Sequence, residues 1–535
     1  MKEQLKGFYN DVVSKPAYWL PILVFTVVAF GYSLFNCSIS TDDLWPLLNR
    51  ESSWFQTSRW GMTVWSYLAG IYMFTPFVDE FIALLYLIGS SVGLSFIFYL
   101  IGKSKDVYGY LILSSIFVTF PLINEIWCYN GANFYYTGGL LLGIITIVVL
   151  NSPLNRLCKY TLSSVLMVLP AASYEAPIFS YITLVCVVIF YKYVVIKKQQ
   201  IKVRRLFEIL FKYAIPLIVA LCIKFAVPFI HNIIYDTPYY SLGQTGIYWL
   251  ESNPIYVFAA IIRSIGFHYI LSALIYLPLT EFLICILVVF FFMTRFSLKQ
   301  KSFFPFLWGC LVVLSIFSQS LLQGCGLPHR SAQGISVFVA FVLFLFYQEV
   351  STNSHSVIKR GVIIMFLFLC WHQSVYIHKI NALNILRSEN ESAMVHDVGN
   401  RLISDYDRKP VVFVSEYSRG KWVNERIHVD KESWNGKLFF EILGKFVPSY
   451  NTGEPVKIIE TNVNPFISAH EVRTPLLLFK YYGYDFDIVT STATIKRAVK
   501  IAKKQNMRPY QIFDYGPFII VQLGAEKYFC DEIEQ

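Results

Sequence analysis

The sequence predicts an α-helical polytopic membrane protein of about eleven transmembrane helices, followed by an extracytoplasmic α/β domain. Of the 535 residues, 55% are hydrophobic and only 15% are charged, against roughly 25% charged in soluble domains. The apolar residues form runs of about 17–25, the length with which a helix crosses the hydrocarbon core of a bilayer. Strands of a membrane barrel would instead alternate in blocks of about ten residues. We therefore expect helices.

The first apolar segment follows three lysines, as a secretory signal would. Its apolar stretch is longer than that of a signal, and no small-residue cleavage site follows, so we expect a retained helix. The predicted spans are 18–36, 77–101, 107–123, 134–151, 158–172, 177–196, 210–230, 270–294, 303–321, 334–350 and 361–378.

The short connections between these spans differ strongly in basic residues. Lys and Arg accumulate in cytoplasmic loops of membrane proteins, and the distribution here predicts a cytoplasmic N-terminus. The odd number of spans then places the residues after 378 outside. We accordingly expect a membrane domain at 1–379 and a periplasmic domain at 380–535. With this topology the short outer loops hold only Arg50, Arg59, Arg263 and Arg330.

The tail differs from the rest in composition. Residues 380–535 hold 20 Lys and Arg and 20 Asp and Glu, so the formal net charge of +10 belongs to the membrane part. The basic excess is therefore a topology signal and does not indicate a nucleic-acid partner. Strands are predicted at KPVVFVS, PVKIIET and GPFIIVQL, and helices at FFEILGKF and ATIKRAVKIAKKQN.

The outer loops carry polar and aromatic side chains that loops of their length do not need. These loops are predicted at 37–76, 124–134, 173–177, 231–269 and 322–334. The 231–269 segment is interpreted as a lid loop with an interfacial or re-entrant helix; as an extra span it would instead invert the later orientation. The candidate site residues are Asp42, Asp43, Arg59, Trp60, Glu125, Asn130, Asn133, Glu175, Tyr239, Tyr240, Arg263, His329 and Arg330.

These residue types suit a reaction between a sugar and a lipid-borne phosphate. Aromatic faces stack on pyranose rings, and carboxylates and amides bind the hydroxyls. Arg grips a phosphate with two hydrogen bonds. A carboxylate near both groups would accept a proton from an acceptor hydroxyl. The combination predicts glycosyl transfer from a lipid-linked sugar.

Three motifs carry a family resemblance. The acidic pair in Ser40-Thr41-Asp42-Asp43 follows a long first helix, and Ser58-Arg59-Trp60-Gly61 comes after a short gap. Near the end of the chain, Met507-Arg508-Pro509-Tyr510 precedes GPFIIVQL. In these features the chain resembles the serotype-converting O-antigen glucosyltransferase family of bacterial membranes, which belongs to the multi-helix GT-C class.

The resemblance implies an activity and residue roles. It implies inverting transfer of a glucosyl or other hexosyl group from undecaprenyl-phosphate-sugar to O-antigen or a similar lipid-linked glycan, at the periplasmic face of the inner membrane. Asp42 or Asp43 would be the general base, and Arg330 would contact the donor phosphate, with His329 and Arg263 as further candidates. The other candidate residues would bind substrate. The partners implied are the polyprenyl-linked donor, the glycan acceptor and membrane lipids.

Each residue also has a structural alternative. The acidic pair could cap the following helix, and Arg59 could be an interfacial anchor whose charge reaches the headgroups. Glu125 and Glu175 at helix ends could be merely solvated, and Arg330 could pair with lipid headgroups. An adjacent Asp pair is compatible with a divalent cation, but no third ligand has suitable spacing, so no cofactor is assigned.

Two other functions compete with glycosyl transfer. An O-antigen polymerase or ligase also has many helices and outer loops, but those proteins tend to use Arg-rich outer loops. A flippase or transporter would show charged residues within its spans and an internal repeat. Here the spans are nearly free of charge apart from Lys224 and Glu281, and we find no repeat, so the sequence favours the enzyme.

Overall fold

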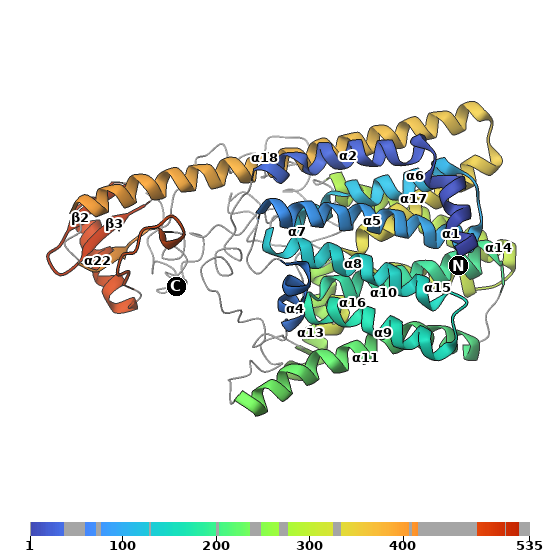
Figure 1. Ribbon diagram of the computed structural model, residues 1–535, viewed down its shortest axis with the longest axis horizontal. Helices are drawn as coiled ribbons and strands as arrows, with labels where there is room; N and C mark the ends of the chain where they lie inside the picture. Colours follow the sequence, from blue (N-terminus) through green and yellow to red (C-terminus); the bar gives the residue numbers. More distant parts are fainter. Residues whose placement is uncertain are drawn as a thin grey trace.

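The computed structural model of the chain shows a bundle of helices that lie side by side, with one long helix leading to a small separate unit (Figure 1). Most of the described residues are helical. The structure describes residues 2–36, 59–70, 76–127, 130–199, 203–235, 248–266, 277–324, 333–405, 409–415, 479–489, 491–508 and 510–523.

The first part of the bundle is organised around α8, which packs between α5 and α9. Its elements are α1 (Lys2–Phe8), η1 (Tyr9–Val13), α2 (Pro16–Phe35), α4 (Trp60–Ala69), α5 (Pro76–Gly102), α6 (Val107–Thr119), η2 (Pro121–Ile123), α7 (Asn124–Trp127), α8 (Asn130–Leu150) and α9 (Arg156–Ser173).

The second part is organised around α10, which contacts α8, α15 and α17. Its elements are α10 (Ala176–Ile189), η3 (Phe190–Ile196), α11 (Val203–Tyr235), α12 (Tyr248–Glu251), α13 (Pro254–Ser264), α14 (Leu277–Gln300), α15 (Phe304–Ile316), α16 (Ser318–Gln323), α17 (Gly334–Asn353) and α18 (Ser356–Asp405).

A helix is found at each of the eleven predicted spans, but fewer have the length and composition of a membrane span. Within the described residues, eight helices are long and apolar enough: those of α2, α5, α8, α10 with η3, α11, α14, α17 and α18. The α6 region and α15 are shorter apolar helices, and α9 begins with Arg156 and Lys159. The chain is thus a polytopic helical membrane protein, and the count of eleven stays a prediction.

Hydroxyl groups connect neighbouring helices in the bundle. Ser114 in α6 lies 2.9 Å from the hydroxyl of Tyr18 in α2 and 2.8 Å from that of Ser95 in α5, and it donates to the carbonyl of Ser91 at 2.9 Å. Lipid tails are as apolar as the side chains, so the hydrophobic effect does not drive helices together within a membrane. Close packing and interhelical hydrogen bonds stabilise the contacts between them instead.

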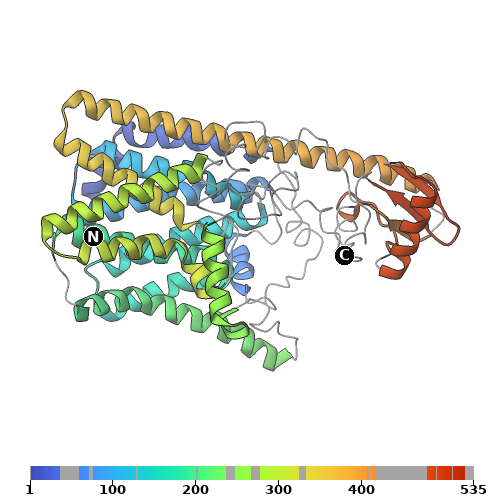
Figure 2. The same cartoon turned by 180° about the vertical axis from the view of Figure 1, so that it is seen from behind.

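The helix α18 is 50 residues long and runs across the predicted domain boundary at 379/380. The hydrophobic core of the bundle extends along α18 as far as Ile380, whereas a second core begins at Met394. Between them the helix has left the bundle (Figures 1 and 2). The boundary itself stays a prediction.

The described part of the tail forms a three-stranded sheet with the order β1-β3-β2. Its strands are β1 (Val411–Phe413), β2 (Gln511–Asp514) and β3 (Ile519–Gln522). β1 is parallel to β3, and β2 is antiparallel to it. β1 and β3 coincide with two predicted strands; β2 was missed because it is a short edge strand without a clear apolar alternation.

The helix α22 (Thr492–Lys504) covers this sheet, as its sequence predicts. Its buried residues Ile495, Ala498, Val499 and Ala502 recur every three to four positions, which is the spacing of one helix face. The predicted elements PVKIIET and FFEILGKF lie outside the described residues.

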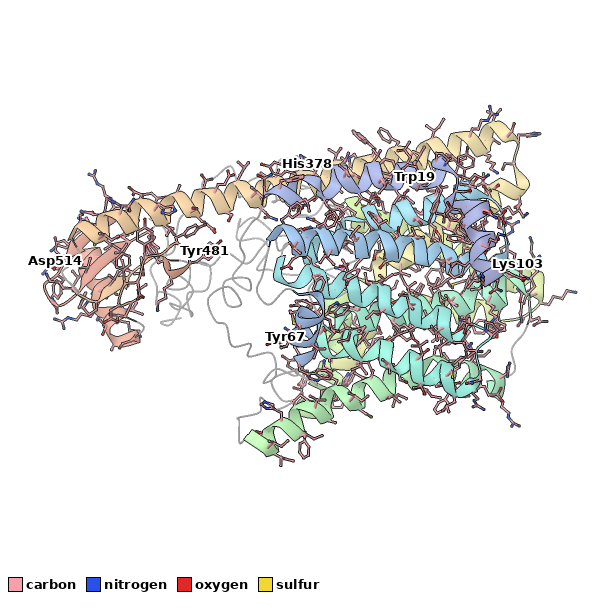
Figure 3. All side chains as sticks on the ribbon, viewed as in Figure 1. Trp19, Tyr67, Lys103, His378, Tyr481 and Asp514 are labelled. Carbon is pink, nitrogen blue, oxygen red and sulfur yellow. The ribbon has the colours of Figure 1, made fainter. Side chains whose placement is uncertain are left out.

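The two ends of the bundle differ in what they carry. The short helices α4, α7 and α13 lie at the end from which α18 leaves, and the N-terminus lies at the other end (Figure 1). Figure 3 labels Tyr67 of α4 at the first end and Lys103 at the second. We call them the α4 end and the N-terminal end.

Candidate active site at the α4 end of the bundle

Described parts of all five predicted outer loops meet at the α4 end. The helices α4, α7 and α13 belong to three of these loops (Figure 1). The fourth, 173–177, is joined to the start of α4 through an ion pair between Arg59 and Glu175. The fifth begins beside α12, because Trp249 donates its indole N–H to the carbonyl of Leu321 at 2.7 Å.

The most highly charged contact at this end joins three helices through Glu175. One carboxylate oxygen accepts a hydrogen bond from Lys224 Nζ at 2.9 Å, and the other lies 3.3 Å from Arg59 Nη2. The Arg59 guanidinium also stands over the ring of Tyr174, 5.4 Å from its centre. Arg59 precedes α4, Glu175 precedes α10, and Lys224 lies in α11. We call Arg59, Glu175 and Lys224 the charged trio.

Trp60 anchors this arrangement through a backbone irregularity in α11. In an α-helix the carbonyl of residue 224 would accept the N–H of residue 228, but residue 228 is proline and has none. The indole N–H of Trp60 donates to the Lys224 carbonyl instead, at 3.1 Å. The buried Trp60 ring thus holds the start of α4 against the turn of α11 that carries Lys224.

Glycine allows α4 to approach the end of α9. A Cβ atom on Gly61 would lie 2.7 Å from the carbonyl carbon of Ala172 and 2.8 Å from Ser173 Oγ, which is closer than real Cβ atoms pack. The sequence Arg59-Trp60-Gly61 therefore combines a cation, an anchor and a close-contact residue, and each serves to hold α4 against the turn that carries Glu175.

The charges around Glu175 keep it ionised. Burial raises the pKa of the Glu175 carboxyl, but the positive charges of Arg59 and Lys224 outweigh burial and lower the pKa from 4.5 to about 2. An acid of this strength is a carboxylate at neutral pH and has little tendency to accept a proton. Glu175 is thus suited to holding two cations in place and unsuited to general acid or base catalysis.

The charged trio carries one net positive charge. The Arg59 side chain is 36% exposed, that of Glu175 26% and that of Lys224 only 5%, so the guanidinium is the more exposed of the two cations. A partly exposed guanidinium with a fixed orientation is a good ligand for a phosphate oxygen or a sugar hydroxyl. These are the chemical features that an anion-binding site would use.

A second polar pair lies at the start of α5. Asn133 Nδ2 donates to Glu80 Oε1 at 3.0 Å, and both residues are buried. Asp79 beside Glu80 is buried as well. Asp79 lies in the first turn of α5, where the helix dipole favours a carboxylate, so this residue has a structural role available in addition to substrate binding.

The aromatic side chains of α4 have two different environments. Trp65 is buried against Phe134 and lies next to Gly138 of α8, where a Cβ atom would come within 2.3 Å of its ring. Tyr67, in contrast, is 64% exposed. Trp65 therefore serves packing, and Tyr67 is the exposed aromatic residue of α4.

The structure brings together only some of the predicted site residues. Arg59, Trp60 and Glu175 meet directly, and Asn133 pairs with Glu80 rather than with them. The backbones of Glu125, Asn130 and Arg263 lie in α7, α8 and α13, with their side chains outside the description. Outside the described residues altogether lie Asp42, Asp43, Tyr239, Tyr240, His329 and Arg330.

Three residues of this end were not predicted as site residues. Lys224 had been noted only as a charge within a span; its position four residues before Pro228, in an apolar run, is the signal that the sequence offers. Asp79 resembles an ordinary first-turn acid and Glu80 follows it; their position at the start of an apolar segment is the only indication of burial. In the parts of the chain that the structure describes, no three His, Cys, Asp or Glu side chains form a metal-binding group.

An apolar helical bundle with a charged cluster where several loops meet defines a polytopic membrane protein with a polar site at one end. Comparison with protein families identifies it further: the chain belongs to the glucosyl transferase GtrII family, whose model matches residues 31–380. The match ends at Ile380, the last residue of the bundle core. Neither the curated proteins nor the solved structures that were compared gave a match.

Family membership confirms the resemblance drawn from the acidic and Arg-Trp motifs. The chain is a membrane glucosyltransferase, and O-antigen as the acceptor fits this family. The helical architecture agrees with this assignment, because all eight membrane-length helices found among the described residues lie wholly or partly within the matched segment.

Proposed function

We propose that this glucosyltransferase transfers its sugar from polyprenyl-phosphate-glucose to a hydroxyl of O-antigen or a similar lipid-linked glycan. The reaction takes place at the α4 end, which faces the periplasm when the eleven predicted helices cross the inner membrane. The observation that carries the proposal is the charged trio of Arg59, Glu175 and Lys224. It supplies a cation where the described parts of the five loops meet.

The reaction is an inverting displacement. The carboxylate of Asp42 or Asp43 takes the proton of the acceptor hydroxyl, and the oxygen attacks the anomeric carbon from the face opposite the lipid phosphate. A new C–O bond to the acceptor forms as the bond to the phosphate oxygen breaks. The leaving polyprenyl phosphate keeps that electron pair and gains negative charge, which cations stabilise.

Cations of the charged trio and of the outer loops together stabilise the negative charge of the donor phosphate. Arg330, with His329 and Arg263, contacts the donor phosphate, and Arg59 adds a further cation at the same end. The negative charge of Glu175 offsets the repulsion between Arg59 and Lys224, and its carboxylate holds the guanidinium in one orientation. Trp60 is a positioning residue because its indole contacts the Lys224 backbone. Glu125, Asn130, Asn133, Tyr239 and Tyr240 contact the sugars.

The proposal is tested by replacing each acidic residue of the first outer loop. The purified Asp42→Asn and Asp43→Asn variants are given polyprenyl-phosphate-glucose and acceptor glycan, and glucosylated product is measured. We expect one variant to lose at least about a hundredfold in rate, since general-base catalysis contributes about 10²–10⁴-fold. Glu3→Gln, in the exposed part of α1, is the matched charge control. Full transfer by both Asp variants would show that neither residue is the base.

A further inference from the structure

A basic cavity lies at the N-terminal end of the bundle, far along the helices from the candidate active site. Its volume is about 640 Å³, and it lies where α8 ends and where α9 and α11 begin. Five cationic side chains line it: Arg156, Lys159, Lys192, Arg205 and Lys212.

The positive charge of the cavity is poorly compensated. Glu208 is the one carboxylate among its described lining residues, and it is held by Arg205 at 2.7 Å. Among the described residues, none of the other four cations has a carboxylate within ion-pair distance. Like charges gathered in a hollow repel one another and raise the local concentration of anions.

The cations are held in place by neutral neighbours. Lys212 Nζ donates to Asn151 Oδ1 at 3.1 Å, and Asn151 is bound in turn by the hydroxyl of Tyr213. Lys192 stands over the ring of Tyr193, and Arg156 over that of Tyr160. Lys192 and Lys212 are half-buried, so part of the cost of ordering their side chains has been met before a ligand binds.

The helices that line the cavity also expose apolar side chains on their outer faces at this end of the bundle. Phe207 and Phe211 on α11 are 66% and 62% exposed, and Leu157 on α9 is 77% exposed. In a membrane-embedded bundle these side chains face acyl chains. A ligand with a phosphate head and hydrocarbon tails would satisfy both surfaces, whereas a soluble phosphate would use only the cations.

We propose that this cavity binds the phosphate headgroup of an anionic phospholipid, with the acyl chains lying along the outer faces of α9 and α11. Basic pockets between membrane helices bind headgroups in this way, because each Lys or Arg near the surface adds to the attraction for anionic lipid. The cavity is separate from the charged trio, and lipid binding there does not depend on the proposed glucosyl transfer.

The test measures the binding of phosphatidylglycerol and phosphatidylcholine to the full-length detergent-purified chain by native mass spectrometry. The wild-type chain should prefer phosphatidylglycerol, and the preference should fall as salt is raised. In Lys192→Gln/Lys212→Gln the affinity for phosphatidylglycerol should fall on the order of tenfold. Lys192→Arg/Lys212→Arg should retain it, and so should Lys2→Gln/Lys6→Gln, which removes two charges at the same end but outside the cavity.

Three results would overturn the assignment. The first is equal binding of both lipids by the wild-type chain, which requires no variant to fold. The second is an equal loss of affinity in Lys2→Gln/Lys6→Gln, which would reflect overall charge. The third is displacement of the lipid by inorganic phosphate at low concentration, which would make a soluble phosphate the ligand.

Discussion

At the residue scale, the charged trio shows how a carboxylate is used to place cations. Glu175 contacts one buried ammonium and one partly exposed guanidinium, and its pKa lies at about 2. The Lys224 side chain is 5% exposed, so the Glu175 carboxylate, and not water, compensates most of its charge. Removing the carboxylate leaves a buried charge without compensation, which costs more than the pair contributes.

The first expected outcome therefore concerns stability. Glu175→Gln should lower the free energy of unfolding by about 3 kcal/mol, the lower end of the range for breaking a buried pair, because Glu175 retains some exposure. The double variant Glu175→Gln/Lys224→Met should recover much of this loss, since it removes the buried charge too. Thermal unfolding in detergent measures both. A double variant that is less stable than Glu175→Gln would contradict the interpretation.

The pH dependence of the same variants provides a second readout. The folded-state pKa of Glu175 is lowered, so its contribution to stability is fully present above the ordinary value of 4.5 and is lost as the pH falls toward about 2. Wild-type unfolding temperature should therefore fall more steeply between about pH 4.5 and 2 than that of Glu175→Gln. Above pH 5 the two curves should run parallel.

At the element scale, the position of α4 depends on an irregular turn of α11. Pro228 leaves the carbonyl of Lys224 without its helical donor, and Trp60 supplies one from another helix. Gly61 then permits contact with the end of α9. A proline in one helix and a Trp-Gly pair in another thus act together, although more than 160 residues separate them.

A double-mutant cycle tests this relation. Trp60→Phe keeps the ring but removes the indole N–H, and should cost about 1–3 kcal/mol because the buried carbonyl loses its donor. In a Pro228→Ala background the helix can supply the N–H of residue 228, so the same substitution should cost less. Unfolding midpoints of the four proteins give the coupling. An equal loss of unfolding free energy in both backgrounds would show that the Trp60 hydrogen bond does not depend on Pro228.

At the scale of the whole molecule, the charged trio and the basic cavity lie at opposite ends of an apolar bundle. The charged trio lies at the α4 end, together with the exit of α18 toward the sheet (Figures 1 and 2). The basic cavity lies at the N-terminal end. This separation agrees with the rule that Lys and Arg gather on the cytoplasmic side, as the proposed periplasmic position of the α4 end requires.

The orientation is tested with reporters at two positions. A reporter fused after Gln535 should respond as extracytoplasmic, and one inserted after Lys301, between α14 and α15, should respond as cytoplasmic. Both insertions leave the helices of the bundle intact. A cytoplasmic response from the C-terminal fusion would place the sheet and the α4 end inside, and would remove the proposed periplasmic site.

Much of the architecture could be predicted because it depends on local composition. A run of about 20 apolar residues forms a membrane helix wherever it occurs, since the backbone must satisfy its own hydrogen bonds in lipid. Each predicted span accordingly coincides with a helix. The family resemblance likewise rested on short local motifs around Asp42 and Arg59, and family membership confirmed it.

The site was only partly predictable, because it depends on contacts between distant segments. Arg59 and Glu175 were each recognised as loop residues with unneeded charge, but their pairing was not. Lys224 was treated as a charge within a span, and Glu80 was not singled out. Nothing in a local pattern shows that residue 224 faces residues 60 and 175, because that depends on how α4, α10 and α11 pack.

The sequence by itself thus determined the class of protein, the positions of its helices and the family to which it belongs. These follow from hydrophobicity and short motifs, which act over one helix or one loop. Only the tertiary structure decided that Glu175 holds two cations, that Trp60 satisfies the Lys224 carbonyl and that basic residues from three helices share one cavity. Ion pairs and hydrogen bonds act over a few ångströms, so they exist only where the fold brings distant residues together.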